Sequence, residues 1–359
     1  MDVQPDGRSE IEVLVIGAGQ AGLGTAHWLR REGVHDVVVV EAGGVGQSWQ
    51  DRWASLQLFT PRRFSSLPGR RFPPGPTRSP SRLEMAGYLA SYAAELGLPV
   101  RTGTPVRRLA RAEGGFLAST PSGGIRARHV VLATGAFRRP RVPEAAGGLD
   151  PAVHQLHSSR YRTPEDVPAG PVLVVGGGNS AAQLAIELSD AHEVTVAAPA
   201  CPRFLPEDVL GVSIYWWLLL SGILNAGAST PLARFLRSRH EAILGRQLRG
   251  LVRAGRVRLV PHAVVGAAGG SVRLADGSTE RPRTVLWCTG FEPDTGWLDV
   301  PGALDDRGAP LHAAGASPVP GLHWMGLPWQ TRVNSSLVDG VDRDARRTAR
   351  RIARAVAGQ

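Results

Sequence analysis

The sequence contains no lysine. All 41 of its basic residues are arginine, and they leave a formal net charge of +10 at pH 7. Apart from positions 343–354, where arginines decorate a predicted helix, they are dispersed along the chain. Proteins that bind nucleic acids combine such charge with aromatic side chains on which bases stack, and no such aromatics accompany the arginines here. We therefore interpret the charge as a solvated surface and expect no nucleic-acid partner.

Cysteine is scarce. The two cysteines, Cys201 and Cys288, lie far apart and form no C-x-x-C pair. This spacing excludes a disulfide framework, a cysteine-based zinc site and a dithiol redox centre. The scarcity is typical of a protein in a reducing cytoplasm, and we expect no metal.

Long hydrophobic runs are missing as well. The most apolar stretch, residues 212–224, is shorter than the about 20 residues that a membrane-spanning helix needs. The first ten residues are polar and carry no apolar signal segment. The pattern predicts a soluble, cytoplasmic protein with no transmembrane segment. Residues 212–224 are then explained by packing in the core or in a homodimer, or else by a substrate-entrance wall or a membrane-surface contact.

The sequence does contain a glycine-rich turn near its start. Residues 11–22 read Ile-Glu-Val-Leu-Val-Ile-Gly-Ala-Gly-Gln-Ala-Gly, so a strand-forming run meets the spacing G-x-G-x-x-G and a helix-compatible segment follows. Gly17 permits the bend, Gly19 lets a pyrophosphate approach the backbone, and Gly22 lets the helix lie close to the strand. A second apolar run ends in Glu41, whose carboxylate can accept both ribose hydroxyls. A glycine-rich turn in an ordinary α/β domain is the alternative.

The same pattern returns 159 positions later. Residues 171–181 form an apolar run that continues as G-x-G-x-x-A, and Gly176 stands where the first motif has Gly17. Two such units in one chain predict two bound dinucleotides. Ala198 occupies the position of Glu41 in this second unit, so no carboxylate would repel a ribose 2′-phosphate, and Arg203 is close enough in sequence to bind one. This favours NADPH, with NADH as the alternative.

Two further apolar strands end in small residues, at Ala133-Thr134-Gly135 and at Cys288-Thr289-Gly290. Together the patterns predict an α/β fold of two Rossmann-like dinucleotide-binding domains, with the second, the nicotinamide domain, inserted in the first. We place the first domain at residues 1–168 and 291–359, and the NAD(P)H domain at residues 169–290. Elsewhere we expect a loop at 56–80, helices at 81–96 and 338–356, a hairpin-like region at 104–125, a linker at 138–170 and a mostly helical segment at 203–256.

These segments resemble single-component flavin-dependent (class B) monooxygenases, and among them the flavin-containing, YUCCA-like group. The resemblance rests on both glycine motifs, on the segment Gly46-x-x-Trp49-x-x-Arg52-Trp53 and on the strand ends with Thr and Gly. His157 and Tyr161 match the fingerprint that precedes the second nucleotide motif in this family, although the Phe and Gly expected before them are absent. Tyr161 argues against a Baeyer–Villiger enzyme.

The resemblance implies a set of cofactor and catalytic residues. FAD would be held by Gly17, Gly19, Gln20, Gly22, Glu41, Gln47, Trp49, Arg52 and Val106. NADPH or NADH would lie on Gly176, Gly178, Asn179, Ser180 and Ala181, with Arg203 as the phosphate partner, and Thr134, Gly135, Thr289 and Gly290 would mark the crossings between the domains. The catalytic candidates are His157, Gln330 and Asn334. The alternatives are a structural role for His157, and for Gln330 and Asn334 the satisfaction of backbone groups in an irregular loop.

The activity that the resemblance implies is oxygenation. NAD(P)H would reduce FAD, O₂ would add at flavin C4a, and the resulting (hydro)peroxyflavin would insert one oxygen into a small organic substrate by N-, S- or C-oxygenation. The protein would exclude water and hold the nicotinamide in place. Two alternatives stay open: a flavin-dependent NAD(P)H oxidase or reductase that inserts no oxygen, and a non-catalytic FAD-binding protein.

Overall fold

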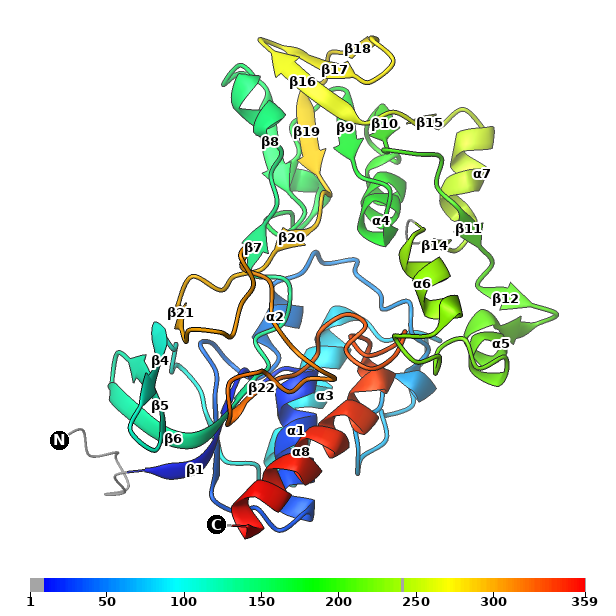
Figure 1. Cartoon of the computed structure of the whole chain (residues 1–359). Coiled ribbons are helices and arrows are strands. Elements are labelled where there is room, and N and C mark those ends of the chain that lie inside the picture. Colours follow the sequence, from blue (N-terminus) through cyan, green and yellow to red (C-terminus); the bar gives the residue numbers. More distant parts are fainter. Residues whose placement is uncertain (1–9, 240–241, 359) are drawn as a thin grey trace.

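The computed structural model describes residues 10–239 and 242–358. The chain forms two lobes, each built on its own β-sheet, and the segments that connect them cross between the lobes (Figure 1). The two sheets confirm the predicted α/β fold with two Rossmann-like units, the second inserted in the first. In the part of the chain that the structure describes, no helix is long and apolar enough to cross a membrane.

The first sheet has eight strands in the order β21-β4-β5-β6-β1-β2-β3, and β22 pairs with β6 outside this path. Its parallel centre is formed by apolar runs in β1 (Ile11–Ile16) and β2 (Val37–Val40) and by the end of β6 (Gly123–Leu132). β-branched side chains favour this extended, fully buried position. The other strands are β3 (Val100–Arg101), β4 (Arg108–Ala112), β5 (Gly115–Thr120), β21 (Leu298–Asp299) and β22 (Leu322–Trp324).

Three helices cover the first sheet: α1 (Gln20–Arg31), α3 (Arg82–Glu95) and α8 (Val341–Ala357) (Figure 1). Ser81 begins α3 with a capping box, since its hydroxyl accepts the Glu84 N–H at 3.2 Å and the Glu84 carboxylate accepts the Ser81 N–H at 2.8 Å. α8 buries Ala345, Ala349 and Ile352 against the core it shares with α1. The predicted helices at 81–96 and 338–356 are thus confirmed.

The second lobe contains a five-stranded parallel sheet in the order β15-β10-β9-β19-β8. Its strands are β8 (His154–His157), β9 (Val172–Val175), β10 (Val194–Ala197), β15 (Val257–Val260) and β19 (Thr284–Trp287). The helices α4 (Asn179–Leu188) and α7 (Gln247–Arg253) pack with this sheet. A smaller antiparallel sheet of β16 (Val264–Ala268), β17 (Ser271–Leu274) and β18 (Thr279–Glu280) lies at the far end of the lobe (Figure 1).

Residues 203–256 are less helical than the sequence predicts. This segment begins with three short strands, β11 (Phe204–Leu205), β12 (Asp208–Val209) and β13 (Val212–Ser213). They are followed by the short helices α5 (Ile214–Leu220) and α6 (Pro231–Arg237), by β14 (Ile243–Leu244) and by α7. Glycines in the left-handed conformation interrupt the helical pattern, with φ of +73° at Gly211 and +75° at Gly222. The prediction of a mostly helical segment is therefore wrong in extent.

The chain crosses between the lobes through β7 (Arg139–Pro140) and β20 (Phe291–Glu292), which pair antiparallel. β8 lies within the expected linker at 138–170, yet it pairs with β19 in the second sheet. The partition at residues 168 and 290 stays a proposal, and the pairing of β8 indicates an insert that begins before His154. Short helical turns complete the fold: α2 (Gln47–Gln50), η1 (Arg62–Phe64), η2 (Glu144–Gly148), η3 (Pro164–Asp166) and η4 (Val338–Gly340).

Candidate dinucleotide sites and the crossing between them

The first glycine motif forms a tight turn from β1 into α1. Gly17 has a φ of +108°, and its N–H donates to the Val40 carbonyl at 2.8 Å. A Cβ on Gly17 would lie 2.4 Å from the Ala133 carbonyl oxygen, and one on Gly22 only 1.8 Å from the Gly17 oxygen. By contrast, a Cβ on Gly19 would meet no heavy atom of the described residues within 4 Å. The turn is thus packed from below and open at Gly19, as a pyrophosphate at the start of α1 requires.

Glu41 fastens this turn to the end of β2. Its Oε2 accepts the Ala18 N–H at 2.7 Å, and its Oε1 lies 3.4 Å from the Gly43 nitrogen. A carboxylate has about four acceptor sites, so these two bonds leave acceptor capacity for ribose hydroxyls. Gln20 is the first residue of α1, beside the same turn. The structure therefore brings Glu41 and the first glycines together, as the sequence predicts.

The second motif repeats this construction at β9 and α4. Gly176 has a φ of +148°, its N–H donates to the Ala197 carbonyl at 2.9 Å, and a Cβ on it would lie 2.3 Å from the Cys288 carbonyl oxygen. Gly178 precedes the first residue of α4 in extended conformation, as Gly19 precedes α1. Ala181 is buried in the position that corresponds to Gly22. Both turns therefore present a helix N-terminus at the carboxyl end of a parallel strand.

Asn179 has a contact that the sequence does not predict. Its Oδ1 accepts the Leu244 N–H at 2.9 Å, and its Nδ2 lies 3.4 Å from the Ala242 carbonyl. The neighbouring Ile243 N–H donates to the carbonyl of Arg203 at 2.8 Å. β14 thus links the N-terminus of α4 to exposed Arg203. Ser180, next in α4, is partly exposed. No local pattern could reveal this link, because the partners lie more than 60 residues apart.

His157 lies at the crossing between the lobes. Its Nδ1 accepts the Ser159 N–H at 3.1 Å and its Nε2 lies 3.0 Å from the Gly290 carbonyl, so Nε2 carries the proton. Burial lowers the pKa of His157, the Gly290 carbonyl opposes this, and Arg52 lowers it further. The imidazole is therefore neutral at pH 7. Its ring meets that of Phe291 edge-on at 5.1 Å. These contacts are those of a histidine that holds the crossing together.

Arg52 belongs to the same crossing. Its guanidinium lies 4.5 Å from the ring centre of Phe137 and 5.5 Å from that of Phe291. Burial lowers the pKa of Arg52, and Arg162 adds to this. The Thr289 hydroxyl donates to the Arg141 carbonyl. Gly135 and Gly290 both have positive φ, +72° and +80°, where the chain leaves β6 and β19.

Three other candidate FAD-binding residues lie in the first lobe, which contains the first glycine turn. Gln47 begins α2 and donates to Asp51 at 2.7 Å, and Trp49 packs against the core beneath α1. Val106 packs on the opposite face of the first sheet. Partly exposed Thr134 follows Ala133, whose carbonyl supports Gly17.

Gln330 and Asn334 are buried and have partners inside their own loop. The Gln330 Oε1 accepts the Leu327 N–H at 3.2 Å, and the Asn334 Nδ2 donates to Asp339 at 2.9 Å. Burial raises the pKa of Asp339, and the bond from Asn334 opposes this. These contacts fit the structural alternative, and a part in oxygen chemistry stays a proposal.

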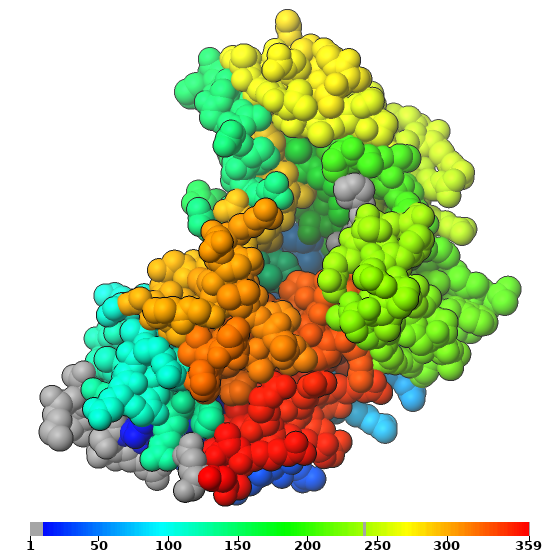
Figure 2. Space-filling view, in the orientation of Figure 1, coloured from blue at the N-terminus to red at the C-terminus, as the bar shows by residue number. Residues whose placement is uncertain are grey.

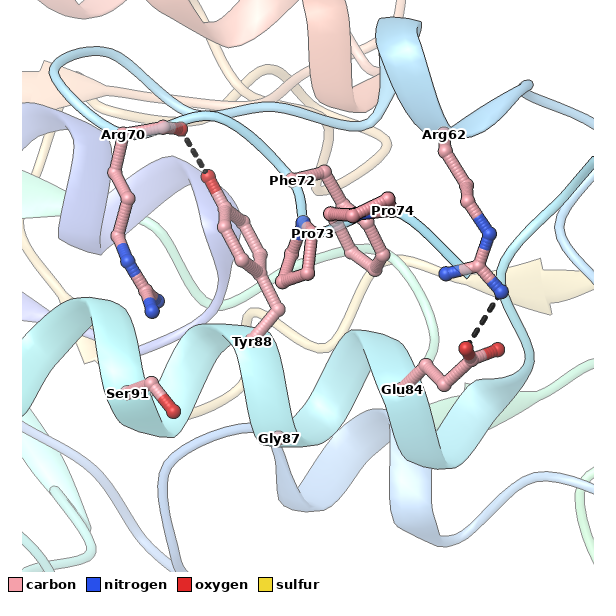
Figure 3. Close-up of a pocket in the computed structure, with 9 residues that line it drawn as sticks. All are labelled: Arg62, Arg70, Phe72, Pro73, Pro74, Glu84, Gly87, Tyr88 and Ser91. Atoms are coloured by element: carbon pink, nitrogen blue, oxygen red, sulfur yellow. Dashed lines mark hydrogen bonds and ion pairs between the residues drawn. The ribbon is translucent and has the colours of Figure 1, made fainter. Parts of the chain in front are cut away.

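The surface is hollowed between the two lobes, where residues of the orange and yellow-green segments border a recess (Figure 2). A separate cavity of about 180 Å³ lies between α3 and the loop at 56–80 (Figure 3). Tyr88 and Phe72 form part of its wall, with Arg62 at one end bound to Glu84 at 2.5 Å. None of the predicted site residues lines this cavity. In the described ranges, no cluster of side chains could hold a metal ion.

Comparison with known proteins places the chain in a family. Residues 14–207 match the family described as pyridine nucleotide-disulphide oxidoreductase. The chain is 39% identical to the "Uncharacterized oxidoreductase CzcO-like" of Geobacillus kaustophilus, over 93% of this chain and 96% of that protein. It is 28% identical to indole-3-pyruvate monooxygenase YUCCA1 of Oryza sativa subsp. japonica, over 86% and 82% of the two chains.

A solved structure agrees with these relatives over nearly the whole chain. The flavin-containing monooxygenase from Stenotrophomonas maltophilia superposes with a TM-score of 0.80 and 29% identity, covering 97% of this chain and 100% of that one. The chain therefore belongs to the pyridine nucleotide-disulphide oxidoreductase family, and within it to the flavin-dependent class B monooxygenases.

Proposed function

We propose that this enzyme consumes NADPH to insert one oxygen atom from O₂ into a small, soft nucleophile such as a thioether or an amine. The observation that carries the proposal is the pair of matching glycine turns, each packed beneath its first glycine by a carbonyl oxygen, at 2.4 Å from a Cβ on Gly17 and 2.3 Å from a Cβ on Gly176. Two dinucleotide cradles with no C-x-x-C pair suit hydride transfer to a flavin that reacts with O₂ rather than with a disulfide.

The residues of the first lobe fit FAD. The open backbone at Gly19 would take the pyrophosphate, and Glu41 would take the ribose. Bound FAD would supply the hydride acceptor and the reaction with O₂. The chain itself contributes binding, orientation and exclusion of water. Neutral His157, fixed between Ser159 and Gly290, would hold the crossing at one geometry while both nucleotides are bound.

NADPH is the proposed reductant because of two features of the second lobe. Ala198 is fully buried where the first unit has a carboxylate, so no negative charge opposes a 2′-phosphate. Arg203 is exposed and directly precedes β11, and its carbonyl is linked through β14 to the start of α4. An exposed guanidinium there can bind a phosphate bidentately. With NADH the arginine would have no phosphate to bind.

The nucleotide preference is tested by steady-state kinetics with both coenzymes. Arg203→Gln should lower kcat/KM for NADPH about tenfold, the loss of one charged phosphate contact, and leave the value for NADH unchanged. Arg249→Gln, on the exposed face of α7, is the matched control. A wild-type enzyme that prefers NADH, or an Arg203 variant with an unaltered ratio, would contradict the assignment.

Oxygen insertion is tested by the balance of electrons and oxygen. FAD-loaded enzyme receives NADPH and ¹⁸O₂ in the presence of a thioether, an amine or a ketone. A monooxygenase converts a thioether, O₂, NADPH and a proton to sulfoxide, water and NADP⁺, and the sulfoxide carries one ¹⁸O. If one hydrogen peroxide is formed for each NADPH oxidised, whichever nucleophile is present, the enzyme is an oxidase. If neither coenzyme reduces the flavin, the protein is a binding module.

A further inference from the structure

Within the second lobe, the segment that contains β12, β13, α5 and α6 projects from one side of the molecule (Figure 1, Figure 2). It exposes large apolar side chains that a solvated surface does not need. We use the term lobe patch for six of them: Leu210, Val212, Trp217, Leu220, Leu232 and Phe235. Large apolar side chains exposed together on one projecting segment mark a place that binds a protein or a membrane.

Leu210 is the most telling member of the lobe patch. β12 and β13 are joined by the two-residue turn Leu210-Gly211, and both residues have positive φ, +53° and +73°. A hairpin turn with two positive φ values favours Asn-Gly, because asparagine tolerates the left-handed conformation and leucine does not. The leucine side chain is also 88% exposed. Leu210 thus destabilises the protein in two ways, by its left-handed backbone and by its exposed apolar side chain. Such a residue points to a role in binding rather than in stability.

The neighbours of Leu210 form a rigid base for it. The Trp217 indole N–H donates to the Val209 carbonyl at 3.1 Å and fixes α5 against the hairpin. Leu220, 77% exposed, follows one turn later on the same helix. A tryptophan with a satisfied N–H and an apolar ring half in water has the chemistry of the bilayer interface.

Arginines lie on or next to the helix that carries two members of the patch, Leu232 and Phe235. Arg234, Arg237 and Arg239 are exposed in or just after α6, and within the described residues none of them has a carboxylate within 4 Å. The guanidinium of Arg239 lies 4.4 Å from the ring centre of Phe235. Of the acidic groups on the hairpin, Asp208 is paired with Arg78 and Glu207 remains. The apolar side chains are therefore accompanied by a net positive charge.

We propose that the lobe patch docks this enzyme on an anionic lipid bilayer. Leu210 and Leu220 enter the boundary between headgroups and acyl chains, Trp217 lies at headgroup level, and the arginines of α6 contact lipid phosphates. A second copy of the chain is disfavoured as occupant, because the arginines of two copies would repel each other.

The test uses the full, FAD-loaded protein and co-flotation with vesicles of phosphatidylcholine containing one quarter phosphatidylglycerol. We expect the wild type to float with these vesicles, less so in high salt, and to bind pure phosphatidylcholine more weakly. Leu210→Asn should lower the vesicle partition coefficient about tenfold, because it removes one leucine side chain from the interface. The same variant should unfold at an equal or higher temperature, since Asn-Gly suits the turn, so loss of binding cannot be ascribed to misfolding.

Two further variants complete the design. Arg234→Gln combined with Arg237→Gln should weaken binding to the anionic vesicles and leave binding to pure phosphatidylcholine unchanged. Leu83→Gln, a 59% exposed leucine on α3, is the control and should float like the wild type. Wild-type protein that stays in solution would overturn the proposal, as would a Leu210 variant that floats fully. A wild-type dimer that Leu210→Asn converts to monomer, without any vesicle binding, would assign the patch to a second copy instead.

Discussion

Gly19 and Gly22 belong to the same turn but face opposite surroundings. A Cβ at Gly22 would meet the Gly17 oxygen at 1.8 Å, whereas one at Gly19 would enter open space. Gly19→Ala should therefore fold and fail to bind FAD, because the new methyl occupies the position proposed for the pyrophosphate. The ratio of flavin to protein absorbance should fall at least tenfold while the circular dichroism spectrum stays the same.

Gly22→Ala is the companion variant at this turn. It should lose fold and flavin together, because helix and strand cannot keep their distance with the extra carbon. A Gly19→Ala protein that is purified yellow and fully loaded would contradict the proposed FAD site.

Two buried histidines make stability depend on pH. His129 and His323 lie 6.0 Å apart by ring centres, and neither ring has a hydrogen-bond partner among the residues described. Burial lowers the pKa of His323 to about 3, and His129 and Arg351 add to this. Glu12, 3.9 Å from His129, is the facing carboxylate.

The sign of the effect follows from the unfolded value of 6.5. Above pH 6.5 both states are neutral and stability is unaffected. As the pH falls from 6.5 towards 3, only the unfolded chain takes up the proton, so the free energy of unfolding falls, by about 2 kcal/mol at pH 5. Urea unfolding of His323→Leu at pH 7.5 and pH 5 should show a pH dependence smaller by that amount.

At the scale of the element, α3 carries a glycine that its helix does not need. Gly87 lies inside α3 on an exposed face, and a Cβ there would have no neighbour within 4 Å in the described structure. Gly87→Ala should raise the free energy of unfolding by about 0.5 to 1 kcal/mol through helix propensity. Thermal unfolding checks this.

Gly46→Ala supplies the opposite case. Gly46 has a φ of +77°, and a Cβ on it would lie 2.9 Å from the backbone of Ala86 in α3. This substitution should destabilise the protein by about 1 to 3 kcal/mol. If both glycine variants shift the midpoint in the same direction, packing around α3 differs from that described.

The sequence predicts those elements whose signal is local. β1, α1 and β2, and again β9, α4 and β10, are found where apolar runs and glycines predict them. β8 is missed because His-Gln-Leu-His has no apolar run, and its strand conformation comes from pairing with β19. Residues 214–220 have the apolar character of a core helix, yet Trp217 and Leu220 are exposed.

The candidate site divides in the same way. The glycine turns and Glu41 follow from spacing, since each is fixed by neighbours in one β-α-β unit. The hydrogen bond of Asn179 to β14 and the contacts of Arg52 with the rings of Phe137 and Phe291 could not be predicted. These contacts join residues far apart in sequence, and only the packed fold brings them together.

At the scale of the whole molecule, the crossing should govern communication between the lobes. Phe291 contacts both Arg52, at 5.5 Å, and His157, at 5.1 Å. Phe291→Ala should keep FAD bound and slow flavin reduction by NADPH about tenfold, because the lobes lose a fixed geometry. Stopped-flow absorbance measures the rate.

The matched variant is Phe137→Ala, which removes the ring next to Arg52 and its edge-on contact with Phe291 at 5.2 Å but keeps the contact between Phe291 and His157. It should slow reduction less than Phe291→Ala. Equal rates in both variants and the wild type would show that the lobes need no such fixation.

The order of the helices along the sequence has a consequence for the synthesis of the chain on the ribosome. α1 is made early, but α8, which covers it, follows the entire inserted lobe, about 300 residues later. At about 5 to 20 residues per second, the side of α1 that α8 covers is left exposed for about 15 to 60 s. During this interval the face of α1 that later packs against α8, with Gly24 and Trp28, has no partner. We therefore expect a holdase chaperone to affect the yield during synthesis more than after folding.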